Sequence, residues 1–209
     1  MHITDPGIDA YLGRLAVSAD PVLREMEKLA KERSFPIVGP QVGRLLFALA
    51  RAAGTRRVLE LGSGFGYSAI WFARAVGDGG IVVLTEDSKE HAAAAAGFLE
   101  RAGLGARVRI EVGDALEIAA REAVSYDLIF NDVEKEDYPK VLPIAERLLR
   151  PGGLFVSDNV LWGGEVLRPT RADAAAKGIL RFTKALLASR SFATAIVPLR
   201  DGVAISVRV

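Results

Sequence analysis

The sequence contains no cysteine among its 209 residues, and this absence excludes several classes of site at once. Without thiols the chain cannot form disulfide bonds, bind zinc through thiolates or use a cysteine nucleophile. It also lacks any apolar run near the roughly 20 residues that cross a bilayer, and its first residues lack the basic-then-apolar pattern of a signal peptide. We therefore expect a cytoplasmic protein that does not act at a membrane.

The sequence also lacks an excess of either charge, with 27 basic and 26 acidic residues and a formal net charge of +1. Proteins that bind duplex phosphates usually show a clear basic excess, so the bulk charge argues against a nucleic-acid partner, while a local basic patch stays open. Half of the residues are hydrophobic, which is enough for a sizeable core in a chain of this length. We expect one globular domain over residues 1–209.

What the sequence does contain is a change of pattern near residue 56. Before it, apolar residues recur at helical spacing within 21–33 and 42–49, which predicts two or three helices broken around 35–40. After it, short apolar runs alternate with helical stretches, which is typical of parallel strands buried on both faces. We expect strands at 58–61, 81–85, 108–112, 128–131 and 154–157, with helices near 67–76, 88–102, 137–149 and 172–189.

The end of the chain has a different pattern. Residues 193–199 and 203–209 flank Arg200-Asp201-Gly202, a turn sequence that predicts two antiparallel strands. The sequence therefore predicts the α/β class: a doubly wound, Rossmann-like sandwich with a mostly parallel seven-stranded sheet and an antiparallel C-terminal hairpin. Residues 1–55 would form N-terminal helices, a lead-in or cap on the core of residues 56–209.

A glycine-rich loop follows the first predicted strand, with Gly62, Gly64 and Gly66 at alternate positions and Ser63 and Ser68 beside them. Glycines there let the backbone turn tightly and approach a ligand closely. The helix that starts near Ser68 would present free N–H groups to an anionic group. The spacing G-x-G-x-G differs by one residue from the dinucleotide fingerprint G-x-G-x-x-G. The alternative interpretation is a tight connection that binds nothing.

Acids in register with this loop favour a ligand. Glu86 closes the second strand, 20 residues past Gly66, where an acid typically holds a ribose hydroxyl. Glu60 precedes the loop and suits a ligand that carries an ammonium group. S-adenosylmethionine has a ribose, an ammonium, a carboxylate and a positive sulfonium, and it is the cofactor that we expect. After the third strand, Asp114 would accept a hydrogen bond from an adenine amino group or cap a helix.

Oxygen donors follow the next two strands. Asp132 comes after the fourth strand and Asp158 and Asn159 after the fifth, and the carboxyl ends of neighbouring strands meet at one edge of the sheet. Three such donors suit a hard cation such as Mg²⁺. Lys135 would reach the same place, where a lysine beside a bound cation loses its proton more readily and can act as a general base. The alternatives are that both aspartates are turn residues and that Lys135 is a solvated charge.

Two aromatic residues, Tyr138 and Trp162, flank the expected metal site and would pack on an aromatic acceptor. Ordinary core or rim packing is the alternative for both. His91 lies on the alanine-rich helix after the second strand, and we expect it to have no role in the site.

The motifs cover nearly the whole chain, and D-N-V-L-W-G-G at 158–164 is the most specific of them. The others are V-L-E-L-G-S-G-F-G-Y-S (58–68), L-T-E-D (84–87), G-D-A (113–115), D-V-E-K-E-D-Y (132–138), L-L-R-P-G-G (148–153) and P-L-R-D-G (198–202). Together they resemble the cation-dependent class I O-methyltransferases, which include catechol and caffeoyl-coenzyme A O-methyltransferases.

The resemblance implies an S-adenosylmethionine-dependent methyltransferase domain over residues 1–209, commonly homodimeric, with the N-terminal helices helping to close the site. It implies that Asp132, Asp158 and Asn159 bind the metal, that Lys135 is catalytic and that Asp132 also lies at the cofactor. The cofactor contacts that it implies are Val38, Glu60, Gly62 and Ser68 at the amino-acid end, Ser63, Gly64 and Gly66 in the loop, Glu86 and Asp87 at the ribose, and Asp114 and Ala115 at the adenine.

The acceptor stays open. The catechol enzymes carry a further glutamate shortly before the final D-G, where this sequence reads Thr194-Ala195-Ile196. We expect a small, aromatic acceptor with vicinal oxygens; the alternative is a hydroxylated uridine of transfer RNA, which a basic surface at Arg168, Arg171 and Lys177 would favour. Rivals from other classes are a nicotinamide-dependent oxidoreductase, which the loop spacing disfavours, and a non-catalytic cofactor-binding protein, which the intact metal and lysine residues disfavour.

Overall fold

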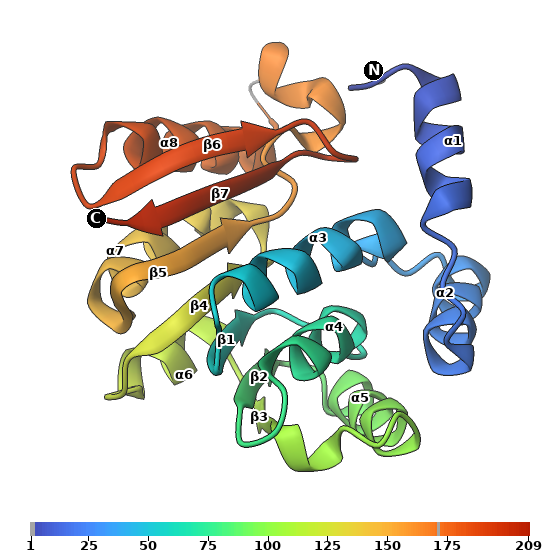
Figure 1. Cartoon of the computed structure of the whole chain (residues 1–209). Helices are drawn as coiled ribbons and strands as arrows, with labels where there is room; N and C mark the ends of the chain where they lie inside the picture. The colour runs from blue at the N-terminus through green and yellow to red at the C-terminus, as the bar shows by residue number, and fades with distance from the viewer. Residues whose placement is uncertain (1–2, 171) are drawn as a thin grey trace.

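The computed structural model describes residues 3–170 and 172–209, which form one seven-stranded sheet with helices on both faces (Figure 1). The strand order is β3-β2-β1-β4-β5-β7-β6. The first five strands in this order are parallel, and β7 runs antiparallel to both of its neighbours, β5 and the edge strand β6. The predicted fold class is confirmed. The strands are β1 Arg57–Leu61, β2 Ile81–Glu86, β3 Val108–Val112, β4 Tyr126–Asn131, β5 Leu149–Ser157, β6 Phe192–Val197 and β7 Val203–Arg208.

The helices form two layers because alternate residues of each parallel strand face opposite sides. Val58 and Val82 pack in the hydrophobic cluster with α3, α4 and α5, whereas Leu59 and Val83 pack in the cluster with α6, α7 and α8. Both faces are therefore covered, which explains the continuous apolar runs. The helices are α1 Pro6–Leu15, α2 Pro21–Arg33, α3 Gly39–Ala52, α4 Tyr67–Val76, α5 Lys89–Arg101, α6 Ala115–Arg121, α7 Tyr138–Leu148 and α8 Ala174–Ala188, with short 3₁₀ turns at Gly105–Arg107, Lys135–Asp137 and Trp162–Leu167.

The N-terminal residues form three helices that differ in how much they bury. Helices α2 and α3 contribute Leu23, Met26 and Val42 to the core, whereas α1 buries no residue and lies apart from the sheet in Figure 1. In the part of the chain that the structure describes, no helix is long and apolar enough to cross a membrane.

Two elements differ from the sequence-based expectation. Strand β5 begins at Leu149, not at residue 154, because residues 150–153 bulge between the pairs Tyr126–Leu149 and Leu128–Leu154. Arg150 holds this bulge against β4 by donating to Asp127 at 2.5 Å. Helix α6 was not predicted, since its seven residues are too short to show a helical period.

Candidate active site

A cavity of about 1450 Å³ lies at the carboxyl ends of the parallel strands, where open α/β sheets bind ligands. Most of the residues predicted from the sequence meet there, although they come from segments as far apart as α3 and β5. The predicted residues that line it are Val38, Gly62, Ser63, Gly64, Ser68, Glu86, Asp87, Asp114, Ala115, Asp132, Lys135, Asp158, Asn159 and Trp162.

The glycine loop approaches the backbone after β4 so closely that side chains are excluded. A Cβ atom on Gly62 would lie 2.6 Å from the carbonyl oxygen of Asp132, and the φ of Gly62 is 79°. The loop is also tied to β2, since the Gly64 N–H donates to Glu86 Oε2 at 2.7 Å. The backbone therefore forms a cradle open to the cavity, with the start of α4 beside it.

Glu60 lies beneath this cradle and is fully buried, so it does not itself line the cavity. One carboxyl oxygen accepts a hydrogen bond from the Ser68 hydroxyl, and among the described residues Oε2 has no partner. Burial raises the pKa of Glu60 to about 8. A buried carboxyl with an unused acceptor behind Ser68 is suited to a cationic group such as an ammonium.

Glu86 faces the cavity from the end of β2 and is held by three groups. Besides the Gly64 N–H, its carboxylate accepts from the Ser88 N–H at 3.1 Å and lies 3.3 Å from His91 Nδ1. These contacts fix the Glu86 carboxylate at the cavity wall. His91 lies on α5 as predicted; its imidazole also lines the cavity and contacts Glu86, and its lack of a role there stays a prediction.

Asp114 is an N-cap, because its Oδ1 accepts from the Glu117 N–H at 2.8 Å and so begins α6. It also lines the cavity next to Gly113 and Ala115. The two interpretations left open by the sequence are therefore compatible, since the second carboxylate oxygen has no role in the cap.

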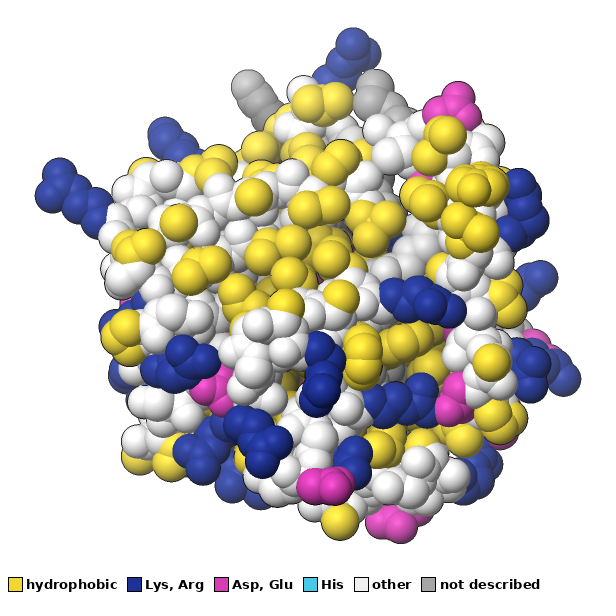
Figure 2. Space-filling model, in the orientation of Figure 1, with side chains coloured by type: hydrophobic (Ala, Val, Ile, Leu, Met, Phe, Trp, Pro, Cys, Tyr) yellow, Lys and Arg dark blue, Asp and Glu magenta, His cyan; other side chains and the backbone are white. Residues whose placement is uncertain are grey.

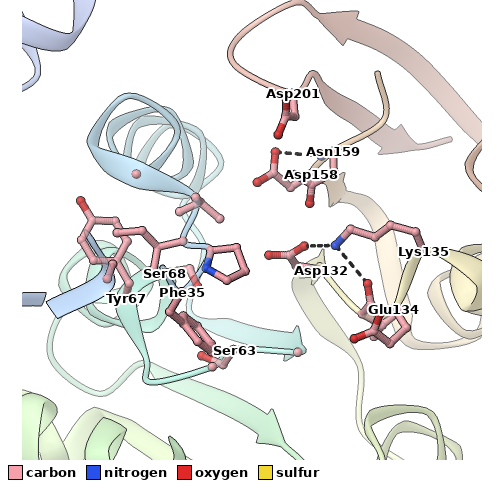
Figure 3. A pocket seen from close by; sticks show the side chains of 18 of the residues that line it. Phe35, Ser63, Tyr67, Ser68, Asp132, Glu134, Lys135, Asp158, Asn159 and Asp201 are labelled. Carbon is pink, nitrogen blue, oxygen red and sulfur yellow. Dashed lines mark hydrogen bonds and ion pairs between the residues drawn. The ribbon is translucent and has the colours of Figure 1, made fainter. Parts of the chain in front are cut away.

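The oxygen donors meet between the ends of β4 and β5 (Figure 3). Asp132 and Asp158 point into the same space, and Asn159 adopts the left-handed conformation with φ of 58°. Lys135 Nζ lies 2.6 Å from Asp132 Oδ1 and 3.2 Å from the carbonyl oxygen of Val133. Asp132 therefore both pairs with Lys135 and faces the space that a cation would occupy.

The electrostatics of this group fit a cation. Burial raises the pKa of Asp158 to about 7, and the negative charge of Asp132 raises it further. Burial also raises the pKa of Asp132, which the charge of Lys135 opposes. Within residues 3–170 and 172–209 no three or more His, Asp or Glu side chains could hold a metal ion, so the Asn159 amide would complete the set. Two carboxylates and an amide are hard oxygen donors that suit Mg²⁺.

Comparison with known proteins agrees with this geometry. Residues 15–209 match the O-methyltransferase family. The chain belongs to that family. It is 34% identical to a catechol O-methyltransferase from Niastella koreensis, covering 96% of each chain, and 39% identical to one from Mycobacterium tuberculosis, covering 82% of this chain and 80% of that one. It superposes with a TM-score of 0.87 and 33% identity on the O-methyltransferase TomG from Streptomyces achromogenes, solved in complex with SAM (S-adenosylmethionine), over 97% of this chain and 96% of that one.

The predicted class I O-methyltransferase family is therefore confirmed, and the chain is a SAM-dependent O-methyltransferase. Besides the buried Glu60, two residues predicted for its site do not line the cavity. Gly66 does not line the cavity, because it starts α4 facing α5, where a Cβ atom would lie 2.9 Å from that of Ala95. The absence of a side chain at Gly66 therefore lets α4 and α5 pack closely.

Tyr138 does not line the cavity of the methyltransferase either, although its ring centroid lies 5.4 Å from Lys135 Nζ. Its side chain is fully buried, its hydroxyl donates to the carbonyl oxygen of Asp158 at 2.9 Å, and its ring packs against Phe182. The expectation for Tyr138 was wrong because spacing along the chain cannot show which face of α7 turns inward. Trp162 does line the cavity, with its ring centroid 5.9 Å from Lys135 Nζ.

The methyltransferase cavity also contains residues that the sequence did not single out. Phe35 and Tyr67 line it beside the glycine loop, and Asp201 points toward Asp158 in Figure 3. Arg200 lines the cavity next to Asp201. Arg200 and Asp201 belong to the motif P-L-R-D-G, and this motif could have indicated that they lie in the site. The local sequence pattern predicted only a turn there.

Proposed function

We propose that this methyltransferase uses a divalent cation, Mg²⁺, to methylate a hydroxyl group of a small aromatic acceptor with vicinal oxygens. The observation that carries the proposal is the meeting of Asp132, Asp158 and Asn159 beside Lys135, next to the cradle of the glycine loop. The donors and the cradle share one cavity, so an acceptor oxygen at the cation would lie close to a methyl donor in the cradle.

The chain's own residues would hold SAM along the cavity. The cofactor supplies a methyl group on a positively charged sulfonium. The free acceptor atom of Glu60 supports a place for its ammonium, and Glu86 supports a place for its ribose hydroxyls. Asp114 and Ala115 would contact the adenine and Val38 the amino-acid end, and in support of this all three line the cavity. These placements keep the predicted order of contacts along the cofactor.

Lys135 is the residue that we propose to handle the acceptor's proton. A bound divalent cation would favour the ionised form of an acceptor hydroxyl. Lys135 Nζ lies 2.6 Å from Asp132 Oδ1, and this contact would hold the amine where it can take the proton of the acceptor hydroxyl. Trp162 would pack against the acceptor ring.

The surroundings of the donors favour a small acceptor over transfer RNA. Glu134, Glu136 and Asp137 line the same cavity as the proposed metal ligands, and their charges oppose a polyanion. Of the basic residues named for an RNA surface, Arg171 lies outside the described residues and Lys177 already has an interaction partner in the structure. Figure 2 shows basic side chains scattered over the visible face without one concentrated patch.

Calorimetric titration tests the proposal. We expect SAM to bind with and without Mg²⁺, and a catechol-type acceptor to bind the SAM complex only with Mg²⁺. Asp158→Asn should abolish the metal-dependent step and leave SAM binding intact. A wild-type protein that fails to bind SAM overturns the whole proposal. Binding of SAM followed by methylation of hydroxyuridine transfer RNA, without any metal-dependent diol binding, overturns the acceptor.

We also propose that residues 1–209 form one domain and that the enzyme is a homodimer. The support for the dimer is α1, whose Ile8, Tyr11 and Leu15 lie on one helical face with 52%, 52% and 61% of their surfaces exposed. Figure 2 shows hydrophobic side chains gathered over this helix. An apolar helix face without a partner in its own chain fits a second copy of the chain.

A further inference from the structure

The segment of residues 35–39 leads from α2 to Gly39, the first residue of α3, and lines the cavity along its whole length. Phe35 anchors the first end of this segment beside the glycine loop. The Phe35 ring centroid lies 4.9 Å from that of Phe65 in the glycine loop and 4.8 Å from that of His91 on α5. The ring also covers Gly64, where a Cβ atom would come within 2.7 Å of it. The loop is thus anchored beside the glycine cradle.

Arg200, which lies near the C-terminus of the chain, binds the other end of this segment. Its Nη1 donates to the carbonyl oxygen of Ile37 at 3.1 Å and to that of Val38, residues 163 and 162 positions earlier. Arg200 lies in the β6–β7 turn with φ of 50°, a left-handed conformation that is uncommon outside glycine. In Figure 1 this turn reaches toward the N-terminal end of α3.

Gly39 provides the space that this contact needs. A Cβ atom at position 39 would overlap the Arg200 guanidinium, and the φ of Gly39 is 72°. Helix α3 begins here without a side-chain cap, and Gly39, Pro40 and Gln41 line the cavity. Backbone N–H groups without helical partners therefore lie at the cavity wall, near the amino-acid end proposed for the cofactor.

We propose that Arg200 is a positioning residue for the cofactor: by holding the carbonyl groups of Ile37 and Val38, it clasps the loop over the amino-acid end of SAM and slows its release. The proposal rests on the cofactor site proposed above. Arg200 itself is exposed, so the clasp contributes little to the core and acts through the loop. Releasing it frees one wall of the cofactor cavity.

Three variants and one control test the clasp by calorimetry and stopped-flow displacement of SAM. Arg200→Ala should raise both the Kd and the dissociation rate of SAM roughly tenfold, with kcat at saturating SAM within about twofold. Arg200→Lys keeps a donor and should lie between. Gly39→Ala pushes the guanidinium away and should weaken SAM in the same direction. The control is Arg44→Ala, because Arg44 donates to the carbonyls of Ala16 and Val17 at 3.2 and 3.3 Å outside this cavity.

The outcomes separate this proposal from the proposed function. If the wild-type enzyme binds SAM and Arg200→Ala binds and releases it equally fast, the clasp is overturned and the methyltransferase site stands. An equal loss in Arg44→Ala, or a fall in Tm of Arg200→Ala beyond about 2 °C, indicates a general structural role and also overturns it. Wild-type protein that binds no SAM overturns both proposals together.

Discussion

Among single residues, Glu60 links cofactor binding to pH. Burial raises its pKa from 4.5 to about 8, so near pH 7 most of the cofactor-free enzyme holds this carboxyl protonated. An ammonium beside it favours the ionised form. We therefore expect SAM binding at pH 7 to release a proton and the affinity to rise with pH up to about 8. Titration calorimetry in two buffers of different ionisation enthalpy measures this release.

The same shift affects stability without cofactor. Because the folded state binds this proton more tightly than the unfolded state, the contribution of Glu60 is fully present below pH 4.5 and is lost as the pH rises through about 8. Glu60→Gln removes the titrating group, so both the proton release and this part of the pH slope should disappear. Proton release that persists in Glu60→Gln would contradict the assignment.

Lys135 is a second single residue whose substitution should change the reaction. Lys135→Met should reduce kcat at least about 100-fold, since it removes the proton acceptor beside Asp132, while the Kd of SAM stays within about threefold. Lys140→Met is the matched control, because Lys140 makes a similar 2.6 Å ion pair with Asp137 but is exposed and lies outside the cavity. Single-turnover kinetics measure the step. Equal activity in the two variants would remove Lys135 from the mechanism.

At the scale of elements, two glycines differ in whether their surroundings leave room for a side chain: Gly62 in the glycine loop has no room, whereas Gly97 in α5 does. Gly62→Ala places a Cβ atom 2.6 Å from the Asp132 carbonyl oxygen at a φ of 79°, and we expect it to destabilise the fold by about 1–3 kcal/mol and weaken SAM binding. Gly97 is exposed within α5 with nothing near its Cβ position, so Gly97→Ala should stabilise the enzyme by up to about 1 kcal/mol. Urea denaturation compares both, and a neutral Gly62→Ala would refute the cradle geometry.

Elements also show how far the sequence could predict this site. Glu86, Asp132 and Asp158 end buried strands, and because parallel strands end at one edge, their meeting followed from the pattern alone. Arg200 and His91 could not be found that way. The contact of Arg200 with Val38 joins positions 162 residues apart, and His91 was placed on a helix whose orientation the period alone does not fix. Tyr138 failed for the same reason, since it turns inward under Asp158.

The bulge in β5 shows another limit of local pattern. Pro151-Gly152-Gly153 predicts that a helix ends shortly before it, and α7 does end at Leu148. The strand nevertheless starts at once, since Leu149 pairs with Tyr126 and Arg150 binds Asp127. Strand boundaries here depend on partners in β4, and these partners lie about 25 residues away along the chain.

At the scale of the whole molecule, α1 is the element whose stability a single chain does not explain. It buries no residue of its own, yet Ile8, Tyr11 and Leu15 form an apolar face on it. If a second copy covers this face, charge placed there must disrupt the assembly, because an unpaired charge in an apolar interface costs several kcal/mol. We expect Leu15→Arg to convert a dimer to a monomer in sedimentation at micromolar concentration.

The control for this prediction is Leu187→Arg on α8, since Leu187 is exposed to a similar extent, 57% against 61%, but lies on another helix. It should leave the dimer intact. A wild-type enzyme that sediments as a monomer would refute the dimer, and dissociation by both substitutions would move the interface away from α1.

Because α1 and the 35–39 loop belong to the same N-terminal segment, a Leu15→Arg monomer should also bind SAM more weakly if the partner supports this cap. Unchanged SAM affinity in that monomer would show that the cap is complete within one chain.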